Sequence, residues 1–306
     1  MVTKKIKRAW LDPRDAGRKL ASRLGFIPPQ PFNELLFRAH ALATREIGLR
    51  GVRIIMSYDC DTPEDANAAA QLFDQLEARK VPAAFAVPGA MLLDASDVYG
   101  RLAARGVTFL NHGALPHTEF RDGRYHARTF YNEMSEQQVV QDISEGHRIV
   151  TQVTGRAPRG FRAPHFGYFQ KPEQRALVYQ VAREHGYAFC SDTLPGTGYA
   201  RGPIFDAGGL AEIPLSGSYA DPYTILDSWN YLADAVNFRL REDYLALFSE
   251  TVDYFTSRKL PAVLNYYVDP AHVIGSDTFM NAIDDAQGRG AQFISFDDLI
   301  AASGRG

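Results

Sequence analysis

Residues 52–61 read VRIIMSYDCD, a run of apolar and β-branched side chains that ends in two aspartates two positions apart. Such a run is typical of a buried β-strand. Pro63 and the segment EDANAAAQLFDQLEAR (64–79) follow directly, and this segment is rich in good helix formers. A strand, a short turn and a helix are therefore predicted in succession.

The same alternation of short apolar runs and longer amphipathic segments continues along the chain. The further runs expected to be strands are 83–87, 107–110, 160–164, 187–191, 210–215, 262–268 and 291–296. The segments expected to be helices are 94–105, 135–155, 172–186, 241–258 and 276–287. This order predicts an α/β protein with about seven parallel strands, either doubly wound or closed into a barrel. No phosphate-binding glycine loop opens a helix, which argues against nucleotide binding.

Composition narrows the class of protein. The chain has 306 residues, of which 45% are hydrophobic and 23% charged, as in ordinary soluble globular proteins. The net charge of −3 gives no reason to expect a nucleic-acid partner. Two cysteines cannot form a disulfide framework, which fits a reducing compartment. No stretch has the apolar length of a secretory signal or a membrane span, so we expect a cytoplasmic protein.

The first 50 residues form a separate unit in this interpretation, a basic and helical extension before a catalytic domain at 51–306. Residues 1–23 carry eight basic side chains against two acidic ones, a net charge of +6, with Trp10 and several leucines between them. This pattern is compatible with contact to an anionic membrane surface or a lipid-linked substrate. The alternative, which we favour, is a solvated arm packed loosely on the domain.

Candidate functional residues fall where the predicted strands end, which is where active groups of parallel α/β folds lie. Because side chains alternate across a strand, Asp59 and Asp61 are expected on one side and Cys60 on the other. Asp61 could instead cap the helix that begins after Pro63. The ends of the later strands carry His112, His117, Arg162, His165, Tyr168, Asp192, Asp269 and His272. One aspartate and two histidines suit a divalent metal with an open coordination position.

The order of these motifs resembles the polysaccharide deacetylase family, the NodB-homology domain of carbohydrate esterase family four. The resemblance covers roughly residues 51–300, and its most specific pieces are SYDCDTPEDANAAAQLFDQLEARKVPAAFAVPG (57–89) and TGRAPRGFRAPHFGY (154–168). It implies an irregular (β/α) barrel that removes acetyl groups from N-acetylated sugars with the help of a bound metal.

Carried over to this chain, the resemblance makes Asp59 the general base, oriented by Arg162. Asp61, His112 and His117 become the metal ligands. The family usually has a histidine before the proline of its last motif; here Asp269 stands there, and His272 follows three residues later. We expect His272 to be the general acid, with Asp269 as its rival.

Further residues are expected to contact the sugar or to stand in for a missing Asp-Trp element of the family. They are Tyr168, Asp192, Trp229 and Asp269. Zinc is the metal to expect first, and the ligand set also admits cobalt, nickel or manganese.

The leading functional hypothesis is a metal-dependent hydrolase that removes an N-acetyl group from a sugar, an intermediate of surface-polysaccharide or glycolipid synthesis. One alternative is a related amidohydrolase that cleaves a small cyclic or ureido amide. Another alternative is a catalytically silent barrel that only binds glycan. The reason to consider it is that His112 and His117 are five residues apart, whereas the corresponding histidines of the family are usually four apart.

Overall fold

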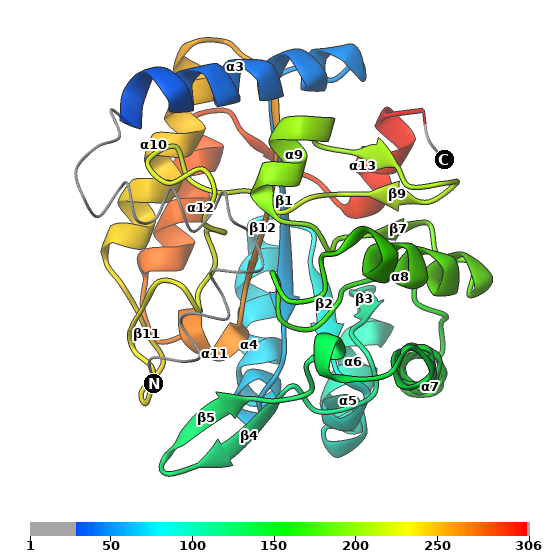
Figure 1. Cartoon of the computed structure of the whole chain (residues 1–306). Helices are drawn as coiled ribbons and strands as arrows, with labels where there is room; N and C mark the ends of the chain where they lie inside the picture. Colours follow the sequence, from blue (N-terminus) through cyan, green and yellow to red (C-terminus); the bar gives the residue numbers. More distant parts are fainter. Residues whose placement is uncertain (1–28, 305–306) are drawn as a thin grey trace.

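A computed structural model describes residues 29–304, and its centre is one curled, nine-stranded sheet (Figure 1). The strands are β1 (Val52–Asp59), β2 (Ala84–Val87), β3 (Thr108–Asn111), β6 (Gly160–Phe161), β7 (Phe189–Cys190), β8 (Phe205–Asp206), β9 (Ala211–Glu212), β12 (Ala262–Val268) and β13 (Gln292–Phe293). They follow the order β12-β1-β2-β3-β6-β7-β9-β8, and β13 also pairs with β1. All pairs are parallel except β8 with β9.

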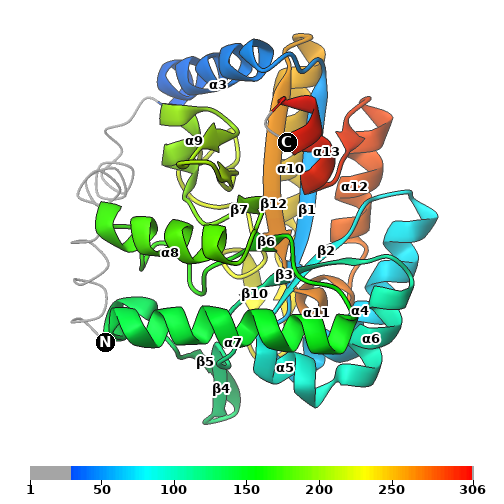
Figure 2. The ribbon, with the colours of Figure 1, turned by 90° about the vertical axis from the view of Figure 1, so that its right-hand side faces the viewer.

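Helices cover the outside of this sheet, as Figure 2 shows for α7 and α8. They are α3 (Pro29–Glu46), α4 (Pro63–Ala78), α5 (Gly89–Asp94), α6 (Ser96–Ala104), α7 (Glu136–Thr154), α8 (Pro172–Glu184), α9 (Pro195–Arg201), α10 (Asp243–Ser257), α11 (Pro270–Val273), α12 (Thr278–Gly288) and α13 (Phe296–Ala302). α7 packs against α5, α6 and α8, and α10 packs against α12. The predicted strand–helix alternation is confirmed, with ends displaced by a few residues.

The sequence signals at the ends of α4 and α7 act as expected. Thr62 and Asp65 form a capping box at the start of α4, so Asp61 is not the N-cap and the capping interpretation of Asp61 is wrong. Ser135 forms the equivalent box at the start of α7. Gly155 ends α7 with a φ of 71°, a left-handed conformation that favours glycine. Asp61 is thereby left to face the carboxyl ends of the strands.

The gap between β9 and β12 is bridged by the segment 213–217. The Ser216 N–H donates to the Asn265 carbonyl at 2.8 Å, and Asn265 Nδ2 donates to the Ile213 carbonyl at 3.0 Å. On the other side, the Leu215 N–H donates to the Thr193 carbonyl at 2.9 Å. These bonds close the sheet with an irregular segment instead of a regular strand, and the predicted irregular (β/α) barrel is confirmed.

Two small antiparallel hairpins were not predicted. They are β4 (Thr118–Arg121) with β5 (Arg124–Ala127), and β10 (Leu232–Asp234) with β11 (Arg239–Leu240). Their strands are short and half exposed, so they lack the apolar alternation of a core strand. The tip of the first hairpin, Asp122-Gly123, has a positive φ at both positions, which is the turn that Asp-Gly favours.

α3 packs across one end of the barrel, above α9 in Figure 2. Phe37 is buried and stacks on Phe255 at 5.2 Å between ring centroids. The His40 Nε2 donates to the Val263 carbonyl at 2.8 Å, which ties α3 to β12. The boundary near residue 50 stays a prediction, and the basic segment 1–23 lies outside the described residues. None of the helices in residues 29–304 is long and apolar enough to cross a membrane.

Candidate active site

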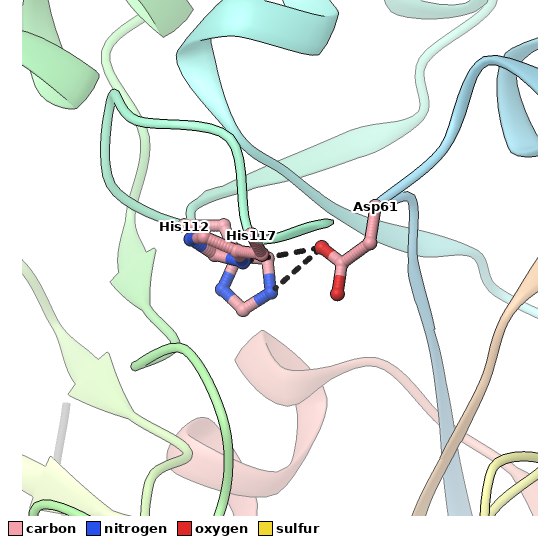
Figure 3. A group of neighbouring side chains, drawn as sticks. All are labelled: Asp61, His112 and His117. Carbon is pink, nitrogen blue, oxygen red and sulfur yellow. Dashed lines mark hydrogen bonds and ion pairs between the residues drawn. The ribbon is translucent and has the colours of Figure 1, made fainter. Parts of the chain in front are cut away.

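Three side chains that could hold a metal ion converge at the carboxyl ends of β1 and β3 (Figure 3). Asp61 follows β1, and His112 and His117 come from the loop after β3. The Asp61 Oδ1 lies 3.1 Å from His117 Nδ1 and 3.6 Å from His112 Nε2. One potential ligand atom from each residue lies within 4.8 Å of the others. The structure therefore brings together all three residues predicted as ligands.

Backbone packing sets the position of His112. Gly146 on α7 lies so close to the loop after β3 that an added Cβ would meet the Gly113 backbone at 2.6 Å. Asn111 Nδ2 donates to the Ile143 carbonyl at 2.8 Å, and Asn111 Oδ1 accepts from the Gly113 N–H at 3.0 Å. A glycine in α7 thus lets the helix hold this loop against the end of the sheet.

The donor atoms of this group fit a divalent cation. The His112 Nδ1 lies 2.7 Å from the Arg162 carbonyl, and a carbonyl only accepts, so Nδ1 carries the proton and Nε2 keeps its lone pair. The His117 Nε2 is buried without a hydrogen-bond partner. Burial by itself would raise the pKa of Asp61, yet His117 and His112 hold it below its usual range. An ionised carboxylate beside two imidazole lone pairs is a ligand set for zinc or a similar metal.

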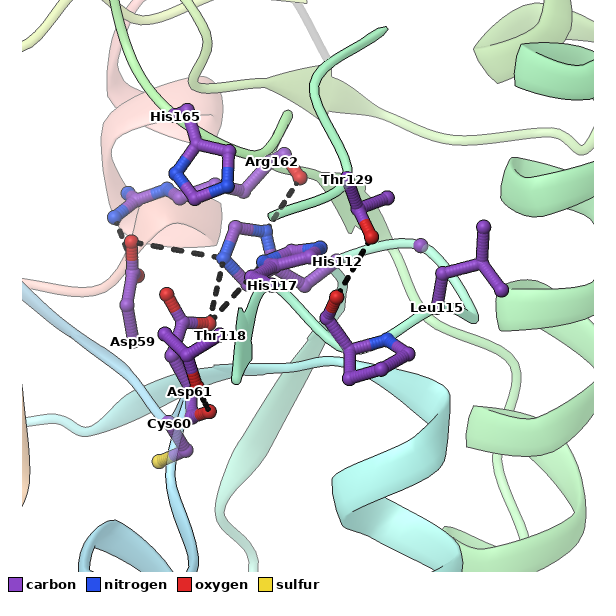
Figure 4. Close-up of polar contacts among 12 residues, drawn as sticks. Asp59, Cys60, Asp61, His112, Leu115, His117, Thr118, Thr129, Arg162 and His165 are labelled. Carbon is purple, nitrogen blue, oxygen red and sulfur yellow. Dashed lines mark hydrogen bonds and ion pairs between the residues drawn. The ribbon is translucent and has the colours of Figure 1, made fainter. Parts of the chain in front are cut away.

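Asp59 lies beside this group and is paired with Arg162 (Figure 4). The Arg162 Nη1 donates to Asp59 Oδ1 at 2.8 Å, and Asp59 Oδ2 lies 3.8 Å from His112 Nε2. Burial raises the pKa of Asp59 to about 7, an effect that Arg162 opposes and the nearby Asp61 charge reinforces. Oδ1 is thus engaged by the guanidinium, and Oδ2 faces the ligand group.

Arg162 is fully buried, and both terminal nitrogens of its guanidinium donate hydrogen bonds, whereas its Nε has no partner among the described residues. Its Nη2 donates to Ser57 Oγ at 2.8 Å and to Ser191 Oγ at 3.2 Å. The rings of Phe166 and Tyr267 each lie 5.4 Å from its guanidinium carbon. Since its carbonyl also fixes the His112 ring, this one residue positions both Asp59 and a ligand histidine.

A cavity of about 780 Å³ opens onto the group, and its lining includes Asp59, Asp61 and His112. Of the residues predicted to contact substrate, Tyr168 and Trp229 line this cavity, whereas Asp192 and Asp269 do not. Asp192 is buried with both carboxyl oxygens unbonded. Burial and the neighbouring Glu212 raise its pKa. The structure thus brings two of these four residues to the cavity.

Asp269 and His272 lie behind the cavity wall. The His272 Nδ1 is 2.9 Å from Ser228 Oγ and 3.8 Å from Asp269 Oδ2, and its ring meets Trp229 edge-on at 4.6 Å. Burial lowers the pKa of His272 to about 3 and raises that of Asp269 well above its usual range. A general acid must carry a proton, and this direction does not favour a protonated His272, because burial outweighs the attraction of the Asp61 carboxylate.

His165 is a strand-end candidate to which the sequence assigns no specific role, and it lines the cavity. Its ring lies 5.6 Å from the ring of His117, and its Nε2 donates to the Arg128 carbonyl at 2.5 Å. Its φ of 54° is a conformation that non-glycine residues adopt rarely. Its place directly after the Arg162-Ala163-Pro164 motif was the signal that could have drawn attention to it.

Comparisons with known proteins give one family match in sequence and a set of similar folds. A family model described as polysaccharide deacetylase matches residues 50–190. No curated protein matches the sequence.

Among solved structures, the chain is similar to a "probable Polysaccharide deacetylase" from Pseudomonas aeruginosa PAO1, with 16% identity, coverage of 83% of this chain and 91% of that one, and a TM-score of 0.59. It is similar to an allantoinase at 15% identity, with coverage of 82% and 89% and a TM-score of 0.56. It also resembles a family-four pseudoenzyme from Bacillus anthracis at 11% identity, with coverage of 82% and 66% and a TM-score of 0.50.

The structural likenesses, at such low identity, show the barrel fold alone. The family model adds a match in sequence over the stretch that contains Asp59, Asp61, His112, His117 and Arg162. Residues 50–190 of this chain thus match the polysaccharide deacetylase family model, and this match includes the site residues described above.

Proposed function

We propose that this protein is a metal-dependent hydrolase that removes an N-acetyl group from a sugar, with an intermediate of surface-polysaccharide or glycolipid synthesis as its substrate. The observation that carries this proposal is the pairing of two arrangements on one cavity. One is the Asp61, His112 and His117 group, and the other is Asp59 held by Arg162. The match of residues 50–190 to the polysaccharide deacetylase family model supports the reaction class.

The proposed ligands are Asp61, His112 and His117, through the lone pairs described above. A divalent cation bound there, zinc first and otherwise cobalt, nickel or manganese, supplies the positive charge that polarises an acyl carbonyl. The Arg162 carbonyl keeps the His112 ring turned toward this position.

Asp59 is proposed as the general base. Its Oδ1 is occupied by Arg162 at 2.8 Å, so Oδ2 is the oxygen placed to take the proton from an attacking water in the cavity. The guanidinium favours the ionised carboxylate and fixes its plane. A base with a pKa near neutrality can accept a proton in one step and release it in the next.

The general acid is proposed at the end of β12, where Asp269 and His272 are the candidates. Burial raises the pKa of the Asp269 carboxyl well above its usual range and lowers the pKa of His272 to about 3, so a retained proton is favoured on Asp269 over His272. We therefore assign the proton to Asp269 first and keep His272, our expectation from the sequence, as the alternative. Tyr168 and Trp229, on the cavity wall, are proposed to stack on the sugar ring.

The experiment is acetate release from N-acetylated oligosaccharides by protein of measured metal content. Release that follows metal occupancy and is lost in the Asp59→Asn protein would support the proposal. The structural likeness of this protein to an allantoinase favours one second candidate function, the hydrolysis of a small cyclic amide. Turnover of allantoin with no acetate release would select that candidate. Glycan binding without either reaction would select the silent barrel.

A further inference from the structure

Two arginines line the cavity. Arg175 lies in the first turn of α8, and Arg201 is the last residue of α9 (Figure 2). Within residues 29–304, neither side chain donates a hydrogen bond or forms an ion pair, and the buried Arg175 Nε has no acceptor. The positive charge of Arg175 acts on the buried Asp192 carboxyl, where it opposes the rise in pKa that burial causes. On the outer surface, by contrast, Arg105 binds both Asp74 and Glu77, at 2.7 and 2.8 Å.

The Arg201 guanidinium is already held in place. It lies over the Phe205 ring, with its central carbon 3.8 Å from the ring centroid. Stacking uses the face of the guanidinium and leaves its N–H edge available to an oxygen acceptor. Arg175 and Arg201 are the only arginine or lysine residues among the described residues that line the cavity.

Acidic residues also line this cavity. Its lining includes Asp59, Asp61 and Asp227, of which Asp59 already has Arg162 as its counterion. An anionic group is disfavoured beside these carboxyl groups and favoured beside the two arginines. The lining therefore combines carboxyl groups that follow β1 with two guanidinium groups that come from α8 and α9.

We infer that Arg175 and Arg201 bind an anionic group of the substrate, a phosphoryl or carboxylate group, while its N-acyl group lies at the Asp61, His112 and His117 end. This inference rests on the proposed function for the identity of the acyl end. A planar guanidinium binds the oxygens of phosphate and carboxylate through two parallel N–H groups, which a neutral sugar does not offer. The substrate class is thus an acidic N-acyl sugar.

The test compares three sugars with the metal-loaded enzyme: N-acetylglucosamine, N-acetylglucosamine 1-phosphate and N-acetylmuramic acid. Arg175→Gln and Arg201→Gln should each raise KM for the acidic sugars by about 10- to 100-fold, the usual worth of one charge-assisted bond. The kcat values and the KM for the neutral sugar should change little. An effect on the phosphate alone, or on the carboxylate alone, identifies which anion is bound.

Arg101→Gln is the matched control, because Arg101 is exposed on α6, outside the cavity, and is also unpaired. It removes the same charge and should change none of these values. The inference would be overturned if Arg175→Gln and Arg201→Gln raised KM equally for neutral and acidic sugars, or if KM were the same in all variants.

A binding measurement separates this inference from the proposed function. Inorganic pyrophosphate is titrated into the wild-type protein and the three variants by calorimetry at low salt. Binding at least tenfold weaker in Arg175→Gln and Arg201→Gln than in Arg101→Gln would support the anion site even if no sugar were hydrolysed. Pyrophosphate binding that is the same in every variant would contradict the site, whatever the enzyme hydrolyses.

Discussion

Asp59 and Asp269 occupy equivalent places at the ends of the neighbouring strands β1 and β12, but their side chains have different neighbours. β1 and β12 pair in parallel from Val52 with Ala262 to Tyr58 with Val268, so each aspartate comes next after the last paired residue. Both are buried. Asp59 receives the Arg162 guanidinium at 2.8 Å and lines the cavity, whereas neither oxygen of Asp269 has a hydrogen-bond partner.

The difference shows that a strand-end carboxyl acquires its chemistry from its neighbours. A buried carboxylate needs a counterion to stay charged, and Arg162 supplies one to Asp59 only. Asp269 has His272 nearby at 3.8 Å, but burial keeps that imidazole neutral. One strand end is therefore suited to hold a metal and accept a proton, and the other to hold a proton.

The largest effect is expected from substitutions of the proposed metal ligands, which lie on the β1 side of this comparison. Alanine at Asp61, His112 or His117 should remove both bound metal and turnover, because each supplies one of three protein ligands. Metal content and acetate release are measured on the same preparations. Full metal occupancy and rate in His117→Ala would contradict the ligand set, and His165, the other histidine on the cavity, would then be tested.

A smaller loss is expected at Asp59 itself. Asp59→Asn keeps the shape and the hydrogen bond from Arg162 but cannot accept a proton, so the rate should fall by about 10³- to 10⁴-fold with metal retained. Loss of metal in this variant would make Asp59 a ligand. A normal rate would remove it from the mechanism.

The β12 side should respond differently to the choice of leaving group. Asp269→Asn should slow hydrolysis of an N-acetyl amide by about 10²-fold and change that of an activated acetyl ester little, because only the amine must be protonated as it leaves. His272→Ala is measured in parallel. The same selective loss in His272→Ala alone would return the acid to the histidine, and no loss in either variant would place the acid elsewhere.

The neutral state of His272 also predicts a pH dependence of stability. Its pKa is about 3 in the folded protein and near 6.5 when exposed, so the unfolded chain binds the extra proton between these values. The free energy of unfolding should therefore fall as the pH drops from 6.5, by up to about 3 kcal/mol at pH 4 from this group.

Urea titrations of His272→Gln and wild type between pH 7 and pH 4 measure this difference. The variant should lose less stability than wild type over that interval. His40 is another buried histidine, with its pKa lowered to about 4, and it lies outside the cavity. The His40→Gln variant should therefore also lose less free energy of unfolding than wild type between pH 7 and pH 4, and its activity should be normal. If the free energy of unfolding fell equally in wild type and in His272→Gln on acidification, the prediction of a neutral His272 would be wrong.

Much of the fold was predictable because its signals are local. The apolar run at 52–58, the Thr62 and Asp65 capping pair, and Gly155 each act within a few residues of chain. The Asp122-Gly123 turn was also readable as a hairpin signal, although the hairpin itself was not predicted. The irregular closure through 213–217 was not readable, since it depends on bonds from Asn265 about 50 residues away.

The sequence by itself determined that Asp59 and Asp61 share one side of β1 while Cys60 enters the core, because strand alternation is a property of the backbone. Only the tertiary structure decided which carboxyl has a counterion. Arg162 reaches Asp59 across 103 residues of chain, and Asp269, one strand away, is enclosed without a cation. Burial and the nearest counterion set the pKa of a group, and both depend on contacts between segments that no local pattern encodes.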